Sequence, residues 1–111
     1  VALSNAGACA LKAGDVERAS RLLRQAIAAS PEDPIALKAL AELEFGRGRA
    51  FEARAFIERR LAAAPADAES LLLASQIEKK LGDTAASARY VHRMRAEFPR
   101  SSGSAPEGGN R

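Results

Sequence analysis

A glycine and a proline recur three times along this chain of 111 residues at one fixed interval. Successive glycines of the set are 34 residues apart, and a proline follows each of them after 17 residues. These positions are Gly14, Gly48 and Gly82, with Pro31, Pro65 and Pro99. A large aliphatic residue keeps the same step at Leu23, Ile57 and Val91. Such a period restricts the chain to repeated copies of one small unit that stack on one another.

A period of 34 residues is that of the tetratricopeptide repeat, in which each unit is a pair of antiparallel helices. We expect three units, at about residues 1–33, 34–67 and 68–101, and hence an all-α superhelix of helical hairpins, an α-α solenoid. Hydrophobic residues make up 47% of the chain but aromatic residues only 5%, which suits close helix packing better than β-sheet. Residues 102–111 are rich in Gly, Ser and Pro, and we expect this tail to be disordered.

Glycine, proline and aspartate mark the ends of the predicted helices. The glycine lies in the turn between the two helices of a unit, where a residue without Cβ readily adopts a left-handed backbone. The proline ends the second helix because it disfavours the α conformation of the residue before it. Asp15, Asp33 and Asp83 are placed to cap the next helices, and Pro34 suits a first helical position. The predicted helices span residues 2–13, 15–29, 34–46, 50–63, 67–81 and 83–97.

The second helix of each unit carries an apolar stripe, because apolar residues recur there every three or four positions. Ala19 and Leu23 belong to the first stripe, and Ala53 and Ile57 to the second. The third stripe is predicted to contain the packing residues Ala88, Tyr90, Val91 and Met94. Each stripe should be buried between neighbouring helices.

No pattern in the sequence points to a reaction centre. His92 is the only histidine and Cys9 the only cysteine, too few for a zinc site and without a nucleophile motif around them. We interpret Cys9 as a small packing residue and His92 as solvated. Glu42 and Glu44 are two residues apart on a helix, so they point to different faces and do not form a paired-carboxylate site. We expect no enzyme activity, no metal and no cofactor.

The charges favour a mixed, solvated surface. Lys and Arg number 17 and Asp and Glu 14, and both signs are interspersed along the chain. Sites for single-stranded nucleic acid combine a basic groove with stacking aromatic side chains, whereas the few aromatic residues here mostly fall at packing positions. The chain also has no apolar run of 18 residues. We therefore expect neither nucleic-acid binding nor membrane insertion by this stretch.

Two longer stretches of the sequence are ALKALAELEFGRGRAFEARAFIERRL and AESLLLASQIEKKLGDTAASARYVHRMRAEFPRS. Both resemble the type IV pilus biogenesis/stability proteins, the PilF/PilW group of tetratricopeptide pilotins. The segments Ser70 to Leu73, Asp83 to Ser87 and Phe98 to Ser101 match the SLLL, DTAAS and FPxS segments in the last repeat of that family. The resemblance spans residues 34–101. It departs from the family at Glu44, where a large apolar residue is usual, and in the tail.

The resemblance implies an outer-membrane lipoprotein that faces the periplasm and helps the pilus secretin to localise and assemble. Its lipidated cysteine would lie upstream of Val1, and Cys9 is not that anchor. The chain is then a non-catalytic scaffold that docks a segment of the secretin or of another pilus component.

Two alternatives stay open. One is a cytoplasmic accessory module of a larger enzyme, such as a glycosyltransferase or sulfotransferase, that positions a polypeptide. The other is a chaperone adaptor with a carboxylate clamp, which needs Lys and Asn where this chain has Ser4 and Ala8.

In arrays of this kind the first helix of each unit lines the concave side, and we expect a protein or peptide partner to bind there. The predicted groove residues are Leu11, Lys12, Ile35, Lys38, Glu42, Phe45, Leu72, Gln76, Lys79 and Lys80. The apolar members would anchor the partner and the lysines would favour acidic flanks, with Phe45 and Lys38 the most informative pair. Alternatively, some of the apolar members complete the core. The chain shows no separate polar capping helix, so we also expect partner capping or self-association through the third hairpin.

Overall fold

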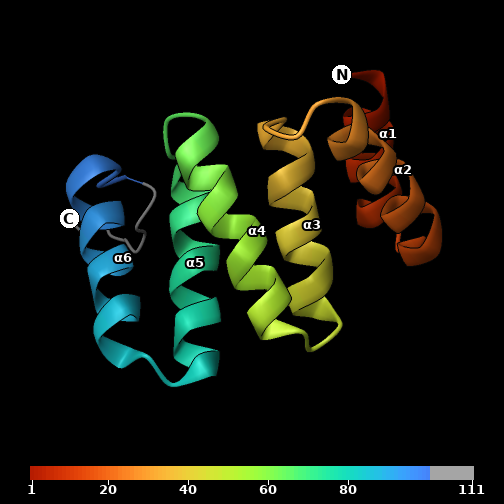
Figure 1. The fold of residues 1–111 in the computed structure, drawn as a ribbon. Coiled ribbons are helices and arrows are strands. Elements are labelled where there is room, and N and C mark those ends of the chain that lie inside the picture. Colours follow the sequence, from red (N-terminus) through yellow and green to blue (C-terminus); the bar gives the residue numbers. More distant parts are fainter. Residues whose placement is uncertain (101–111) are drawn as a thin grey trace. The chain divides into compact units, whose positions relative to one another are not determined.

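The computed structural model describes residues 1–100, and these residues form helices without any strand (Figure 1). The helices are α1 (Ala2–Lys12), α2 (Val16–Ala29), α3 (Pro34–Gly46), α4 (Ala50–Ala63), α5 (Ala68–Leu81) and α6 (Thr84–Glu97). Each one begins and ends within one residue of its predicted bounds. The predicted all-α fold of helical hairpins is therefore confirmed, while the predicted disordered tail lies outside the described residues.

The chain divides into two compact units, Val1–Pro65 and Ala66–Arg111. In the first unit α1 pairs with α2 and α3 pairs with α4, and α3 also packs against both α1 and α2. The third helix thus joins the first hairpin to the second. In the second unit α5 and α6 form a hairpin of their own. Each predicted repeat accordingly contributes one hairpin.

The ends of the helices follow the signals in the sequence. The three repeat glycines, at positions 14, 48 and 82, have φ angles of 84°, 81° and 87°, in the left-handed region that favours glycine. Asp33 accepts hydrogen bonds from the backbone N–H groups of Ile35 and Ala36, and Pro34 occupies the first turn of α3. Asp15, Asp67 and Asp83 cap α2, α5 and α6 in the same way. The predicted turns and caps are confirmed.

The core of the first unit consists mainly of alanine and leucine. It contains Ala10, Ala19, Leu23, Ala26, Ala36, Ala39, Leu40 and Leu43. Leu23 is fully buried and Ile57 nearly so, as their shared place in the period predicts. Burial of one such side chain stabilises the fold by about 1.5–3 kcal/mol. The alanines leave room for the helices to lie close together.

Two packing predictions were wrong. Ala88 is exposed, and Ala86 is buried on α6 instead, together with the predicted Met94. Ala88 lies one residue beyond the repeat equivalent of Ala53, so the helix turns it about 100° away from the packed face. Cys9 is also exposed, because its neighbours Gly7 and Ala10 take the inward face of α1. His92 is exposed, as predicted, and Val91 and Tyr90 are half-buried.

Candidate protein-binding site

The predicted groove residues of the first unit lie on α1 and α3, which pack against each other. Lys12 is exposed at the end of α1. Leu11 is half-buried and packs against the core of this unit, so it completes the core, as the alternative interpretation allowed. The candidate anchors of this unit are therefore on α3.

Along α3 the predicted residues lie on one face, because Ile35, Lys38, Glu42 and Phe45 are spaced by three and four positions. Ile35 is 43% exposed in the first turn, where the Asp33 cap holds its backbone N–H at 3.0 Å. Phe45 is half-buried, so its ring offers a partner less surface than the sequence led us to expect. Lys38 and Glu42 each interact with another group of the protein.

In the second unit the predicted residues form one exposed stripe along α5. Leu72, Gln76, Lys79 and Lys80 follow one another at helical spacing, and all four are exposed. Leu72 is the apolar member, with 43% of its surface accessible. The two lysines lie in the last turn, where positive charge is favourable next to the unpaired carbonyl groups of the helix end. The stripe thus offers one apolar contact and a basic end.

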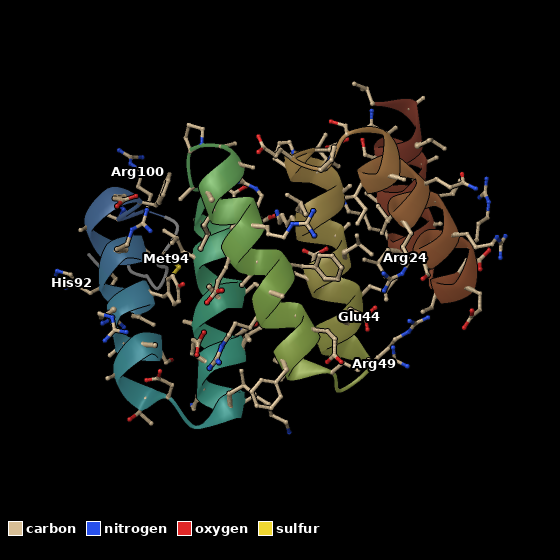
Figure 2. The ribbon with its side chains drawn as sticks, viewed as in Figure 1. Arg24, Glu44, Arg49, His92, Met94 and Arg100 are labelled. Carbon is tan, nitrogen blue, oxygen red and sulfur yellow. The ribbon has the colours of Figure 1, made fainter. Side chains whose placement is uncertain are left out.

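A second group of polar residues was not predicted as a site. The Glu44 side chain on α3 is fully buried and lies among three arginines, of which Figure 2 labels Arg24 and Arg49. Its Oε2 atom accepts a hydrogen bond from Arg24 Nη2 at 2.9 Å and lies 3.6 Å from Arg47 Nη1. Its Oε1 atom lies 3.5 Å from Arg49 Nη1 and has no hydrogen-bond partner in the described structure. The stretch EFGRGR supplied a signal, because it places two arginines three and five residues after this glutamate.

Two aromatic side chains of α4 lie under guanidinium groups. Arg24 and Arg59 both lie over the Phe56 ring, each 5.8 Å from its centroid. Arg54 lies 5.7 Å from the centroid of Phe51, and 70% of the Phe51 surface is exposed. These distances are typical of cation–π contacts. A shallow hollow of about 240 Å³ adjoins Arg59 between the start of α3 and the end of α4.

Within residues 1–100, His, Cys, Asp and Glu side chains form no group of three or more that could hold a metal ion. None of the helices in that range combines the length and apolar character that a membrane span requires. The features that do stand out are surfaces suited to another protein.

The sequence pattern of the tetratricopeptide repeat family matches residues 10–77. This is more than half of the chain, and the chain belongs to that family. Proteins built from such stacked repeats use extended surfaces to bind other proteins, so the chain is a protein-interaction scaffold by class. No curated protein sequence matches the chain.

Among solved structures, the chain is similar to PilW, described as a widely conserved type IV pilus biogenesis factor. The sequences are 31% identical, the TM-score is 0.75, and the match covers 88% of this chain. It covers 45% of the PilW chain, so this chain spans less than half the length of that protein. The resemblance seen in the sequence is thus confirmed by a similarity of structure over most of the chain.

Proposed function

We propose that this chain is the protein-binding part of a type IV pilus biogenesis factor, with a non-catalytic, pilotin-like role in assembly of the outer-membrane secretin. The observation that carries the proposal is the similarity to PilW in both sequence and fold over most of the chain. The SLLL, DTAAS and FPxS segments of the last repeat support it, because they resemble the pilotin group specifically. A segment of the secretin is the first candidate partner.

The partner binds through the first helices of the hairpins. In the first unit the contact centres on Ile35, with Phe45 and Lys38 on the same face of α3. In the second unit it centres on Leu72, next to the basic end of α5. An aliphatic anchor gains affinity by leaving water, while the lysines speed encounter with acidic flanks.

Calorimetric titration of periplasmic secretin segments against the purified chain tests this proposal. Ile35→Glu and Leu72→Glu place a charge at each exposed anchor, and we expect each to weaken binding by about tenfold or more. Phe51→Glu is the matched control, since it places the same charge at an exposed apolar residue of α4. This helix is the second of its hairpin and is not part of the proposed contact. Affinity that survives each anchor change, with folding intact by circular dichroism, would exclude the proposed contact at that anchor.

The proposal places the protein in the periplasm, held at the outer membrane by a lipid anchor upstream of Val1. Fractionation of cells that make the full-length protein, with labelling by a lipid precursor, tests the location. Recovery in the outer membrane with the lipid label supports it. Recovery in the cytoplasm as part of a larger enzyme would favour the alternative of an accessory module.

Self-association through the third hairpin stays a prediction. Met94 is 6% exposed and therefore does not offer a free surface, whereas Leu72 does. If copies of the chain associate through this hairpin, Leu72→Glu lowers the mass measured by light scattering at high concentration. A single monomer mass for the unaltered chain at every concentration would contradict self-association and leave capping by a partner.

A further inference from the structure

Glu44 gathers three arginines from two parts of the first unit. Arg24 comes from α2, as Figure 2 shows, and Arg47 and Arg49 come from the turn that joins α3 to α4. The Glu44 side chain is inaccessible to solvent, while those of Arg24 and Arg49 are 51% and 56% exposed. The carboxylate therefore accepts a hydrogen bond from Arg24 and lies close to the guanidinium groups of Arg47 and Arg49, while about half of the Arg24 and Arg49 side chains faces solvent.

The arginines have many more donors than this one carboxylate accepts. Each guanidinium carries about five N–H groups, whereas a carboxylate offers about four lone-pair sites. Glu17 also pairs with the set; it is 85% exposed and lies 3.6 Å from Arg47. Such an exposed pair is screened by water and salt. The group thus has a net positive charge and more N–H donors than Glu44 can accept.

The positive surface continues along α4 through Phe56. Because Arg24 and Arg59 both lie over this half-buried ring, the aromatic side chain fixes the two guanidinium groups at its surface. Arg59 is held a second time, since its Nη2 atom donates to the carbonyl oxygen of Pro31 at 2.9 Å. We name Arg24, Arg47, Arg49 and Arg59 the arginine cluster.

We propose that the arginine cluster, all of whose members lie in the first unit, is a binding surface additional to the proposed contact at Ile35, and that it takes an acidic segment of a protein partner. Oriented guanidinium groups pair with carboxylates through two parallel hydrogen bonds, so they fit Asp and Glu side chains. Nucleic acid suits the surface less well, because stacking of bases needs an open aromatic face and guanidinium groups lie over the Phe56 ring. Glu44 is a positioning residue, because it acts through the arginines.

Fluorescence anisotropy with a labelled oligoglutamate peptide tests the cluster directly. We expect Arg24→Gln and Arg49→Gln each to weaken binding by about tenfold, since each removes a charged hydrogen-bond donor. Arg89→Gln is the control, because Arg89 is an exposed arginine that lies outside the cluster, on α6. An equal loss from the control would show that only overall charge attracts the peptide, which would overturn the proposal.

Glu44→Gln separates an organised site from simple positive charge. The change raises the net charge by one, so attraction by charge alone predicts tighter binding of oligoglutamate. We expect weaker binding instead, because Arg24 loses the carboxylate that orients its guanidinium group, and Arg47 and Arg49 lose a neighbouring negative charge. Circular dichroism checks whether this variant is folded. If it is not, the peptide affinities of Arg24→Gln and Arg49→Gln, compared with that of Arg89→Gln, decide whether the cluster binds acidic peptides.

Three other anionic ligands test whether the cluster prefers an acidic peptide. Inorganic phosphate, an oligouridylate and vesicles that contain phosphatidylglycerol are titrated under the same conditions. Oligoglutamate should compete at lower concentration than phosphate and should bind more tightly than the other two. Stronger, Arg24-dependent binding of the RNA or of the vesicles would overturn the assignment to an acidic protein segment. None of these measurements uses a secretin segment, so their failure leaves the proposed pilus function to its own test.

Discussion

Gly7 on α1 lies directly against Leu23 on α2. A Cβ atom at position 7 would come within 2.6 Å of both Cγ and Cδ2 of Leu23 and within 3.3 Å of its backbone nitrogen. The two residues are therefore in contact because position 7 has no side chain. The positions one and two repeats later hold Ala41 and Ser75, which are also small and buried.

We expect Gly7→Ala to destabilise the protein by about 1–3 kcal/mol, because the added methyl group forces Leu23 and α2 outward. Thermal or urea unfolding of the two proteins measures the difference. Gly46→Ala is the control, since Gly46 ends α3 with nothing within 4 Å of an added Cβ. That change should be neutral or stabilise by up to about 1 kcal/mol. Equal effects from both changes would contradict the close approach of α1 and α2.

Leu23→Ala removes a side chain that is fully buried in the core of the first unit. We expect a loss of about 2–5 kcal/mol, from lost burial and the cavity that remains. His92→Ala, at an exposed position of α6, should cost less than about 0.5 kcal/mol. Urea melts of both variants give the comparison, and a larger loss for the histidine change would overturn the assignment of faces.

The double variant Gly7→Ala with Leu23→Ala should be more stable than the sum of the two single losses implies. The shorter side chain at position 23 makes room for the methyl group at position 7, so the two changes are coupled. We expect the coupling to recover about 1 kcal/mol or more. Strict additivity in the melts would mean that the two side chains do not meet.

The turn after α3 provides a matched pair of glycines. Gly46 is helical, whereas Gly48, two residues later, has a φ angle of 81°. An added Cβ meets no neighbour at either position, so only the backbone conformation differs. We expect Gly48→Ala to cost about 1–2 kcal/mol, the usual penalty for an L-residue in the left-handed region. Unfolding curves that place Gly48→Ala level with Gly46→Ala would contradict this account of the repeat glycine.

The fold could be predicted from the sequence because its signals are local and repeated. Gly82 and Asp83 mark one turn and cap by themselves, and the same pair recurs two periods earlier as Gly14 and Asp15. One period earlier only the glycine recurs, because Arg49 follows Gly48 and forms no side-chain cap. The predicted groove was less well defined. Leu11 and Phe45 have the spacing of exposed residues, yet both are half-buried, and Leu11 packs against the core that neighbouring helices form.

The contacts between Glu44 and the arginine cluster could not be predicted from local sequence patterns. In the sequence, Glu44 is a single glutamate at a position where the repeat usually has an apolar residue. Arg24 lies 20 residues earlier, and only the folded chain brings its Nη2 atom to 2.9 Å from Glu44 Oε2. The arginines at positions 47 and 49 gave a partial signal. They belong to the turn, however, and their direction is set by backbone bonds to the Glu44 carbonyl oxygen, at 3.2 Å from Arg47 N and 2.8 Å from Arg49 N.

The cost of keeping this buried carboxylate can be measured by comparing Glu44→Gln with Glu44→Leu. The amide of the glutamine variant would present N–H donors to arginines that also donate, so we expect a loss of about 1–3 kcal/mol. The leucine variant buries no polar atom there, and Arg24 and Arg49 are exposed enough to turn to solvent. Replacement of a buried ion pair by a well-packed apolar residue is often neutral or stabilising. We therefore expect Glu44→Leu to melt at or above the temperature of the unaltered protein, while it binds oligoglutamate more weakly. A large loss of stability in Glu44→Leu would mean instead that the carboxylate is kept for folding, and that the arginines are its partners rather than a surface it prepares.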